Sequence, residues 1–142
     1  MDFSLSDDQR AIRDGVGAVV RKFDDAYWLA RDEDGAFPRE FHRAMAEAGW
    51  LGITMPPEYG GAGLGVTEAA IMMHQVANHG GGMAAASAVH INLFGPHPIV
   101  VFGTAEQKAR WLPRLVQGQD QVAFGVTEPD AGSDVAGMRT RA

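Results

Sequence analysis

The residues near the end of the chain have the types and spacing needed to contact a ligand. Thr127 and Ser133 place hydroxyl groups at either end of a turn-rich loop, and Gly132 leaves the backbone N–H groups beside it open to close approach. Hydroxyl and backbone N–H groups together suit recognition of an anion or an amide. The residues therefore predict a loop that touches a ligand, and they show no catalytic group.

The five histidines do not form a metal-ligand pattern. His74 and His79 lie about 140° apart around a helix, and the chain contains no His-Glu-x-x-His motif. The chain has no cysteine, which excludes Cys-ligated zinc, disulfides and thiol chemistry. We expect no metal site. His90 stands in a segment made otherwise of residues such as Ala, Val, Ile and Leu, so it is either a core or interface residue or part of a pocket wall.

Two further motifs come close to catalytic patterns without matching them. The glycine-rich stretch 60–67 resembles a P-loop, but Val66 stands where the phosphate-binding lysine belongs. Close packing of a glycine loop is the better interpretation. Ser133 lies in Ala-Gly-Ser-Asp, which is not the nucleophile elbow of a hydrolase. The carboxylate pairs Asp32/Asp34 and Asp130/Asp134 lie in turns, where caps and solvated faces are expected.

Composition narrows the classes of protein further. The chain has 142 residues, 46% of them apolar and 21% charged, which is typical of one folded domain. A net charge of −6 argues against nucleic acid as a partner. No apolar run approaches the roughly 20 residues of a membrane span, and the acidic start MDFSLSDDQR is unlike a signal peptide. We expect a cytoplasmic protein.

Apolar periodicity and capping signals predict a mostly helical chain. Ser6 and Gln9 form a capping-box pattern that opens a helix over about 7–25. Further helices are expected from Phe37-Pro38 to a stop at Gly49, from a cap at Thr67 to about 79, over 83–93 and over 96–102. A last helix opens at the capping box of Thr104, is interrupted or restarted at Pro113, and ends at Gly118. Residues 50–65 are predicted to be loop.

The spacing of the apolar residues changes from a helical to a strand-like period only near the end of the chain. Val122, Phe124 and Val126 alternate with smaller residues, which predicts a strand over 122–127. A single strand cannot form a sheet. The fold class expected is therefore all-α, with a helical domain over 1–118 and the start of a truncated β domain over 119–142.

The whole chain resembles the N-terminal part of the acyl-CoA dehydrogenase family. The segment 123–134, AFGVTEPDAGSD, is close to a family signature. Three further segments carry the likeness in the family's order and spacing: 35–38, GAFP; 48–53 with 57–65, AGWLGI and PEYGGAGLG; and 102–108 with 111–113, FGTAEQK and WLP.

This resemblance implies an N-terminal helical bundle, followed by the start of a middle β domain, in an FAD enzyme. Such an enzyme dehydrogenates an acyl-CoA thioester between its α and β carbons. In the family a carboxylate takes the α-proton, the β-hydride passes to flavin N5, and an electron-transfer flavoprotein usually reoxidises the FAD. The carboxylate belongs to a C-terminal bundle and maps to no residue here, so this chain alone should not turn over. The whole protein is expected to be a homo-oligomer, a dimer or a tetramer.

The resemblance also assigns site residues. The cofactor contacts it implies are Phe124, Val126, Thr127, Gly132 and Ser133, with Val126 and Thr127 at the pyrimidine edge of the flavin. Ser133 would approach the CoA portion of the substrate, and His90, Leu93 and Phe94 would line the deep end of the acyl pocket. Phe124 departs from the tyrosine of many members. Alternatives that remain open are an acyl-CoA oxidase, a flavin monooxygenase, or a helical interaction module that no longer catalyses.

Overall fold

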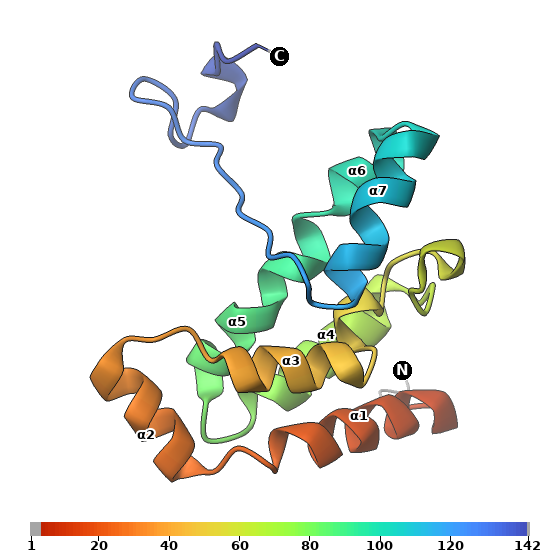
Figure 1. The fold of residues 1–142 in the computed structure, drawn as a ribbon, viewed down its shortest axis with the longest axis vertical. Helices are drawn as coiled ribbons and strands as arrows, with labels where there is room; N and C mark the ends of the chain where they lie inside the picture. The colour runs from red at the N-terminus through yellow and green to blue at the C-terminus, as the bar shows by residue number, and fades with distance from the viewer. Residues whose placement is uncertain (1–3, 142) are drawn as a thin grey trace.

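The computed structural model describes residues 4–141 and consists of helices joined by turns and loops, followed by an extended segment that leads to the C-terminal end (Figure 1). Its α-helices are α1 (Asp7–Val20), α2 (Asp25–Asp34), α3 (Arg39–Glu47), α4 (Val66–Ala77), α5 (Gly82–Phe94), α6 (His97–Phe102) and α7 (Ala105–Val116). Single 3₁₀ turns are η1 (Trp50–Gly52), η2 (Pro57–Tyr59) and η3 (Val135–Gly137). The prediction of an all-α chain is confirmed for these residues.

The main core lies where α1, α3, α4 and α5 pack against one another. The side chains of Val16, Phe41, Met72 and Val89, one from each helix, are fully buried there. Burying side chains of this kind contributes about 1.5–3 kcal/mol each. A smaller cluster joins α7 to the segment after η1, and its buried members are Met55, Leu112, Leu115 and Val116. The main core thus holds α5, and the smaller cluster holds α7.

The glycine-rich stretch 60–65 is a tightly packed turn, as expected. A Cβ on Gly61 would lie 2.1 Å from the carbonyl oxygen of Met55, so only glycine fits. The N–H of Ala62 donates to the carbonyl of Gly52 at 2.9 Å, and the N–H of Leu64 donates to that of Ile53 at 2.9 Å. These bonds use the backbone groups that a phosphate would need.

Three helix boundaries differ from the prediction. The first predicted helix ends earlier than expected, at Val20. A helix that was not predicted, α2, begins at Asp25, where the side chain of Asp24 accepts from the N–H of Tyr27 at 2.9 Å. Helix α4 begins one residue before Thr67, and the Glu68 carboxylate instead accepts from the N–H of Gly65 at 3.2 Å.

Pro113 does not interrupt α7, which runs unbroken to Val116. Proline removes one backbone donor. The helix tolerates the loss because Leu112, Leu115 and Val116 are all buried in the smaller cluster.

The strand predicted over 122–127 is wrong for this chain. These residues are extended, yet among residues 4–141 the structure has no strand, and its one isolated β-bridge joins Glu128 to Ala131. An extended segment becomes a strand only when a neighbour pairs with its N–H and C=O groups, and no described segment does so.

The apolar stretch Gly82–Phe102 has the length and hydropathy of a membrane span. The structure divides it into α5, with 13 residues, and α6, with 6 residues. Spanning a bilayer takes about 20 helical residues. Ala85, Ala86 and Val89 in α5 are buried in the main core. Packing in this core accounts for the apolar character of α5.

One polar pair lies inside the core, between α3 and α5. His42 is 4% exposed and Asn92 is 1% exposed. Burial lowers the pKa of His42 below its ordinary value, with the nearby Asn92 side chain partly offsetting this. Nε2 of His42 and both polar atoms of the Asn92 side chain are buried without a hydrogen-bond partner among residues 4–141. Burial therefore favours the neutral form of the His42 imidazole.

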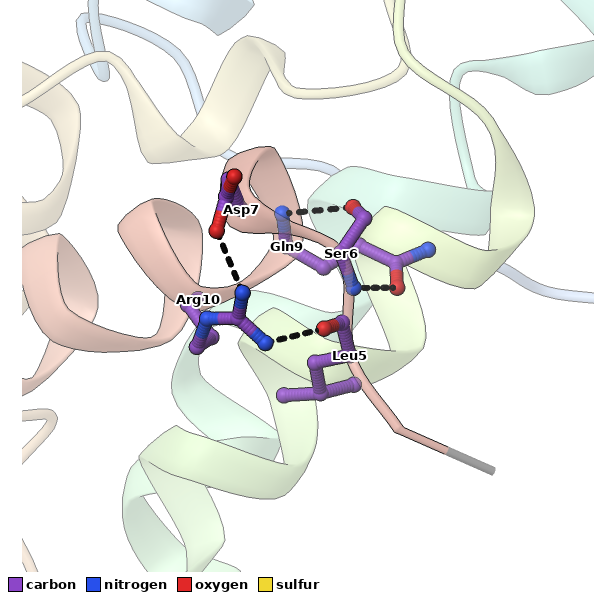
Figure 2. Close-up of polar contacts among 5 residues, drawn as sticks. All are labelled: Leu5, Ser6, Asp7, Gln9 and Arg10. Atoms are coloured by element: carbon purple, nitrogen blue, oxygen red, sulfur yellow. Dashed lines mark hydrogen bonds and ion pairs between the residues drawn. The ribbon is translucent and has the colours of Figure 1, made fainter. Parts of the chain in front are cut away.

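The capping box predicted at the start of α1 is present (Figure 2). The hydroxyl of Ser6 accepts from the N–H of Gln9 at 3.2 Å, and the N–H of Ser6 donates to the Gln9 side chain at 3.1 Å. Asp7 and the carbonyl of Leu5 both contact the guanidinium of Arg10. These contacts satisfy backbone donors that the first helical turn leaves free.

We expect Ser6→Ala to lower the free energy of unfolding by about 1 kcal/mol, because the N-cap acceptor is lost. Urea denaturation followed by circular dichroism measures the change. Ser87→Ala, at an exposed position inside α5, should change it by less than about 0.5 kcal/mol. Equal effects of the two substitutions would contradict the role assigned to Ser6.

Candidate functional site

Three aromatic rings connect α5 to the extended segment 120–127. The rings of His90 and Phe94 lie one helical turn apart on α5, with centroids 4.7 Å apart. The ring of Phe94 meets that of Phe124 edge-on, with centroids 5.2 Å apart and planes at 75°. Phe94 is 38% exposed and Phe124 is 53% exposed. The structure thus brings Phe94, which is predicted to line the acyl pocket, into contact with Phe124, which is predicted to contact the cofactor.

His90 is exposed and lies on the face of α5 that points away from the core. The neighbouring Val89 is fully buried, whereas Leu93 is half-buried. Exposure excludes the interpretation of His90 as a core residue. The assignment of His90 to a pocket wall, with Leu93 and Phe94, stays a prediction. The alternative prediction, that His90 lies at an interface, also stays open.

The residues of the predicted ligand loop lie beyond this contact. Thr127, Gly132 and Ser133 are exposed, and Val126 is half-buried. A Cβ on Gly132 would meet nothing within 4 Å, so the backbone there is open. The loop extends away from the helices, at the blue end of the chain in Figure 1. The structure therefore does not place these residues against the pocket-wall residues of α5.

The loop holds its own shape through Glu128. Its backbone exchanges two hydrogen bonds with Ala131, at 3.0 and 3.1 Å. Its carboxylate accepts from the N–H groups of Arg139, at 2.9 Å, and Thr140, at 2.8 Å, and from the Thr140 hydroxyl. The bond from the Thr140 hydroxyl, followed by those from the two N–H groups, lowers the pKa of Glu128. The chain on both sides of Ser133 is thus tied together.

Comparison with known proteins covers the same helices and loop. The family model described as "Acyl-CoA dehydrogenase, N-terminal domain" matches residues 6–119. The chain belongs to the acyl-CoA dehydrogenase family. Among curated relatives, acryloyl-CoA reductase (NADH) from Anaerotignum propionicum is 38% identical over 100% of this chain and 36% of its own length. Mitochondrial isovaleryl-CoA dehydrogenase from Pongo abelii is 34% identical over 97% and 33%.

Solved structures of the family share this fold. Butyryl-CoA dehydrogenase from Megasphaera elsdenii matches 99% of this chain and 37% of that chain, with a TM-score of 0.84 and 29% identity. Glutaryl-CoA dehydrogenase from Mycobacterium smegmatis matches 96% and 35%, with a TM-score of 0.82 and 36% identity. The chain therefore spans about a third of the length of the acyl-CoA dehydrogenase relatives that it matches.

A groove between α3 and α7 is a feature of this acyl-CoA dehydrogenase chain that sequence reasoning missed. Its volume is about 1180 Å³, and the residues lining it include Arg39, Arg43, Arg110 and Arg114. Arginines four residues apart on each helix were the available signal, since such residues share a face. Asp120 pairs with Arg114 through two bonds, at 2.6 and 2.7 Å, and this pairing lowers the pKa of Asp120.

Among residues 4–141, no three His, Asp or Glu side chains are grouped so that they could hold a metal ion.

Protonation of Glu128 should loosen the loop. Its pKa is lowered in the folded loop, so the contacts with Arg139 and Thr140 stabilise the loop at neutral pH and are lost as pH falls below the ordinary value of 4.5. We expect the amide resonances of Arg139 and Thr140 to titrate together, with a midpoint below 4.5, in an NMR series.

Glu128→Gln should abolish this titration, whereas Asp130→Asn, which removes the same charge from the same loop, should preserve it. A midpoint at or above 4.5, or a titration that survives Glu128→Gln, would show that the carboxylate does not hold the loop.

Proposed function

We propose that this chain is the N-terminal part of an FAD-dependent enzyme that dehydrogenates an acyl-CoA thioester between its α and β carbons. The observation that carries the proposal is the match over essentially the whole chain, at 34–38% identity, to enzymes whose names specify acyl-CoA chemistry. The domain boundary proposed lies between residues 118 and 119, where the helices end and the extended segment begins.

The exposed residues of the loop fit one side of a flavin site. The Thr127 and Ser133 hydroxyls and the backbone beside Gly132 are free of steric cover, and Phe124 offers an exposed ring face. In this proposal Val126 and Thr127 contact the pyrimidine edge, and Phe124, Gly132 and Ser133 complete the contacts. FAD, when bound, accepts the hydride that leaves the β carbon, and the protein's part is to position it.

The substrate side of the site is assigned to α5. His90, Leu93 and Phe94 line the far end of the acyl pocket, and Ser133 approaches the CoA portion. No Asp or Glu of this chain is assigned the α-proton, so the catalytic base is placed outside residues 1–142. An electron-transfer flavoprotein is the proposed acceptor, and the solved relatives include a structure titled for an electron transferring flavoprotein. A cytoplasmic homo-oligomer is proposed for the whole protein.

The same site would also serve reduction of an enoyl-CoA. The relative from Anaerotignum propionicum is named a reductase that uses NADH, and at 38% identity it is as similar to this chain as the named dehydrogenases. Hydride transfer between flavin and the β carbon is the same step in both directions. The direction depends on which electron carrier the whole protein uses.

Two measurements test the proposal. The 142-residue chain should bind FAD only weakly, with a dissociation constant above the micromolar range, because one wall of a site loses most of its contacts. The protein that carries this chain should hold FAD and lose flavin absorbance when a saturated acyl-CoA is added without air. Submicromolar FAD affinity of the chain alone would contradict the first expectation, and a flavin that no acyl-CoA bleaches would contradict the second.

Thr127→Val in the FAD-loaded protein should lower the midpoint potential of the flavin by roughly 30–65 mV. Negative charge accumulates at the flavin's N1–C2=O2 edge on reduction, and a hydrogen bond to a charged acceptor contributes about 1.5–3 kcal/mol. Valine keeps the branched shape, so the hydroxyl alone is removed. Spectroelectrochemical titration measures the shift.

Thr67→Val, which makes the same change on α4, is the matched control and should leave the potential unchanged. Equal midpoints in wild type and Thr127→Val would mean that the Thr127 hydroxyl bonds elsewhere, for example to a neighbouring carbonyl.

A further inference from the structure

The extended segment 120–127 meets the C-terminal end of α5 at two adjacent points. The first is the edge-on contact between the rings of Phe94 and Phe124. The second is the contact between Gly95, directly after α5, and the side chain of Val122. Consecutive residues at the end of α5, Phe94 and Gly95, thus meet alternate residues of the segment, Phe124 and Val122. Two such contacts fix both the position and the direction of the segment.

Gly95 is required here for space and not for its backbone conformation. Its φ of −59° and ψ of −42° are ordinary helical values, which any residue adopts. A Cβ at this position would lie 2.5 Å from Cγ1 of Val122 and 2.6 Å from the carbonyl oxygen of Ile91. A side chain at 95 would therefore push the segment away from α5.

Val122 is held from its other side as well. It is half-buried and packs against the smaller cluster, whose buried members are Met55, Leu112, Leu115 and Val116. The start of the segment thus lies between the end of α5 and the buried face of α7. These two surfaces are part of the helical body, and they do not depend on the loop beyond residue 127.

We propose that Phe94, Gly95, Val122 and Phe124 form an anchor that positions the flavin loop relative to the acyl-pocket wall. The anchor fixes Phe124 against α5, and Thr127 follows three residues later, within about 10 Å along an extended chain. Phe94 carries a pocket-wall position on α5 and contacts Phe124 directly, so both halves of the site share one fixed point. The assignment of the two halves rests on the proposed function, whereas the anchor itself rests on the contacts.

A matched pair of glycine substitutions in the 142-residue chain tests the anchor. Gly95→Ala should displace the segment, whereas Gly125→Ala, whose Cβ would meet nothing within 4 Å, should not. Backbone ¹⁵N relaxation reports the result. Order parameters of residues 122–124 should stay near the rigid value of about 0.85 in wild type and Gly125→Ala, and fall below about 0.6 in Gly95→Ala.

Phe124 supplies a second, independent variant that leaves the core intact, since its ring is 53% exposed. Phe124→Ala should release the segment in the same measurement, and Phe124→Tyr, which keeps the ring, should not. Phe102→Ala removes a ring that is 85% exposed on α6 and should have no effect. Low order parameters in wild type, or equal order in Gly95→Ala and Gly125→Ala, would overturn the anchor.

These measurements need no cofactor, so their outcome is independent of the proposed function. In the FAD-loaded protein, Gly95→Ala should also change the flavin absorption spectrum and lower kcat with a smaller change in KM, because the loop is misplaced while the substrate wall is retained. A released segment with an unchanged flavin spectrum would leave the contacts standing and overturn their role in positioning the cofactor loop.

Discussion

The burial of one face of α5 is the constraint on which the rest of the structure depends. Ala85, Ala86, Ala88 and Val89 are all at most 5% exposed, and small side chains here let α3 and α4 approach closely. A helix fixed on one face has a fixed opposite face. His90 and Phe94 lie on that opposite face, so the core sets their direction even though neither contributes to it. The same helix therefore serves the fold with its alanines and the candidate site with its aromatic rings.

The polar pair inside the core acts on the same helix. Asn92 of α5 and His42 of α3 are both almost fully buried, and burial lowers the pKa of His42. Both polar atoms of the Asn92 side chain lack a hydrogen-bond partner within the described part of the chain, and leaving a buried polar group unpaired costs about 1–3 kcal/mol. A rotation of α5 that exposed its alanines would also move Asn92 out of the core. The burial of the alanines therefore holds α5 in this orientation against the cost of burying Asn92.

Much of the helical fold could be predicted from the sequence because its signals are local. The capping boxes at Ser6 and Thr104 and the stop after α3 at Gly49, whose φ is +82°, depend on neighbouring residues, and all three are present. The strand over 122–127 could not be settled this way, since alternation describes a segment and pairing requires a partner. Helix α2 was missed because its charged residues obscured the cap at Asp24. For the candidate site, the resemblance selected Phe94 and Phe124, but their contact joins residues thirty positions apart and required the structure.

Two separate sets of contacts hold the loop that begins at Glu128. Glu128 fixes the loop's internal shape through bonds to Ala131, Arg139 and Thr140, all within the loop. Packing against α5 and α7 fixes where the loop begins, through Val122 and Phe124. Between these two constraints lie residues 125–127, which include the exposed Gly125, where a Cβ would meet nothing within 4 Å. A loop with a set shape and a set origin can still turn about this short link. In the proposed site, a flavin would then have only the orientation of the loop left to order, which would keep the entropic cost of binding small.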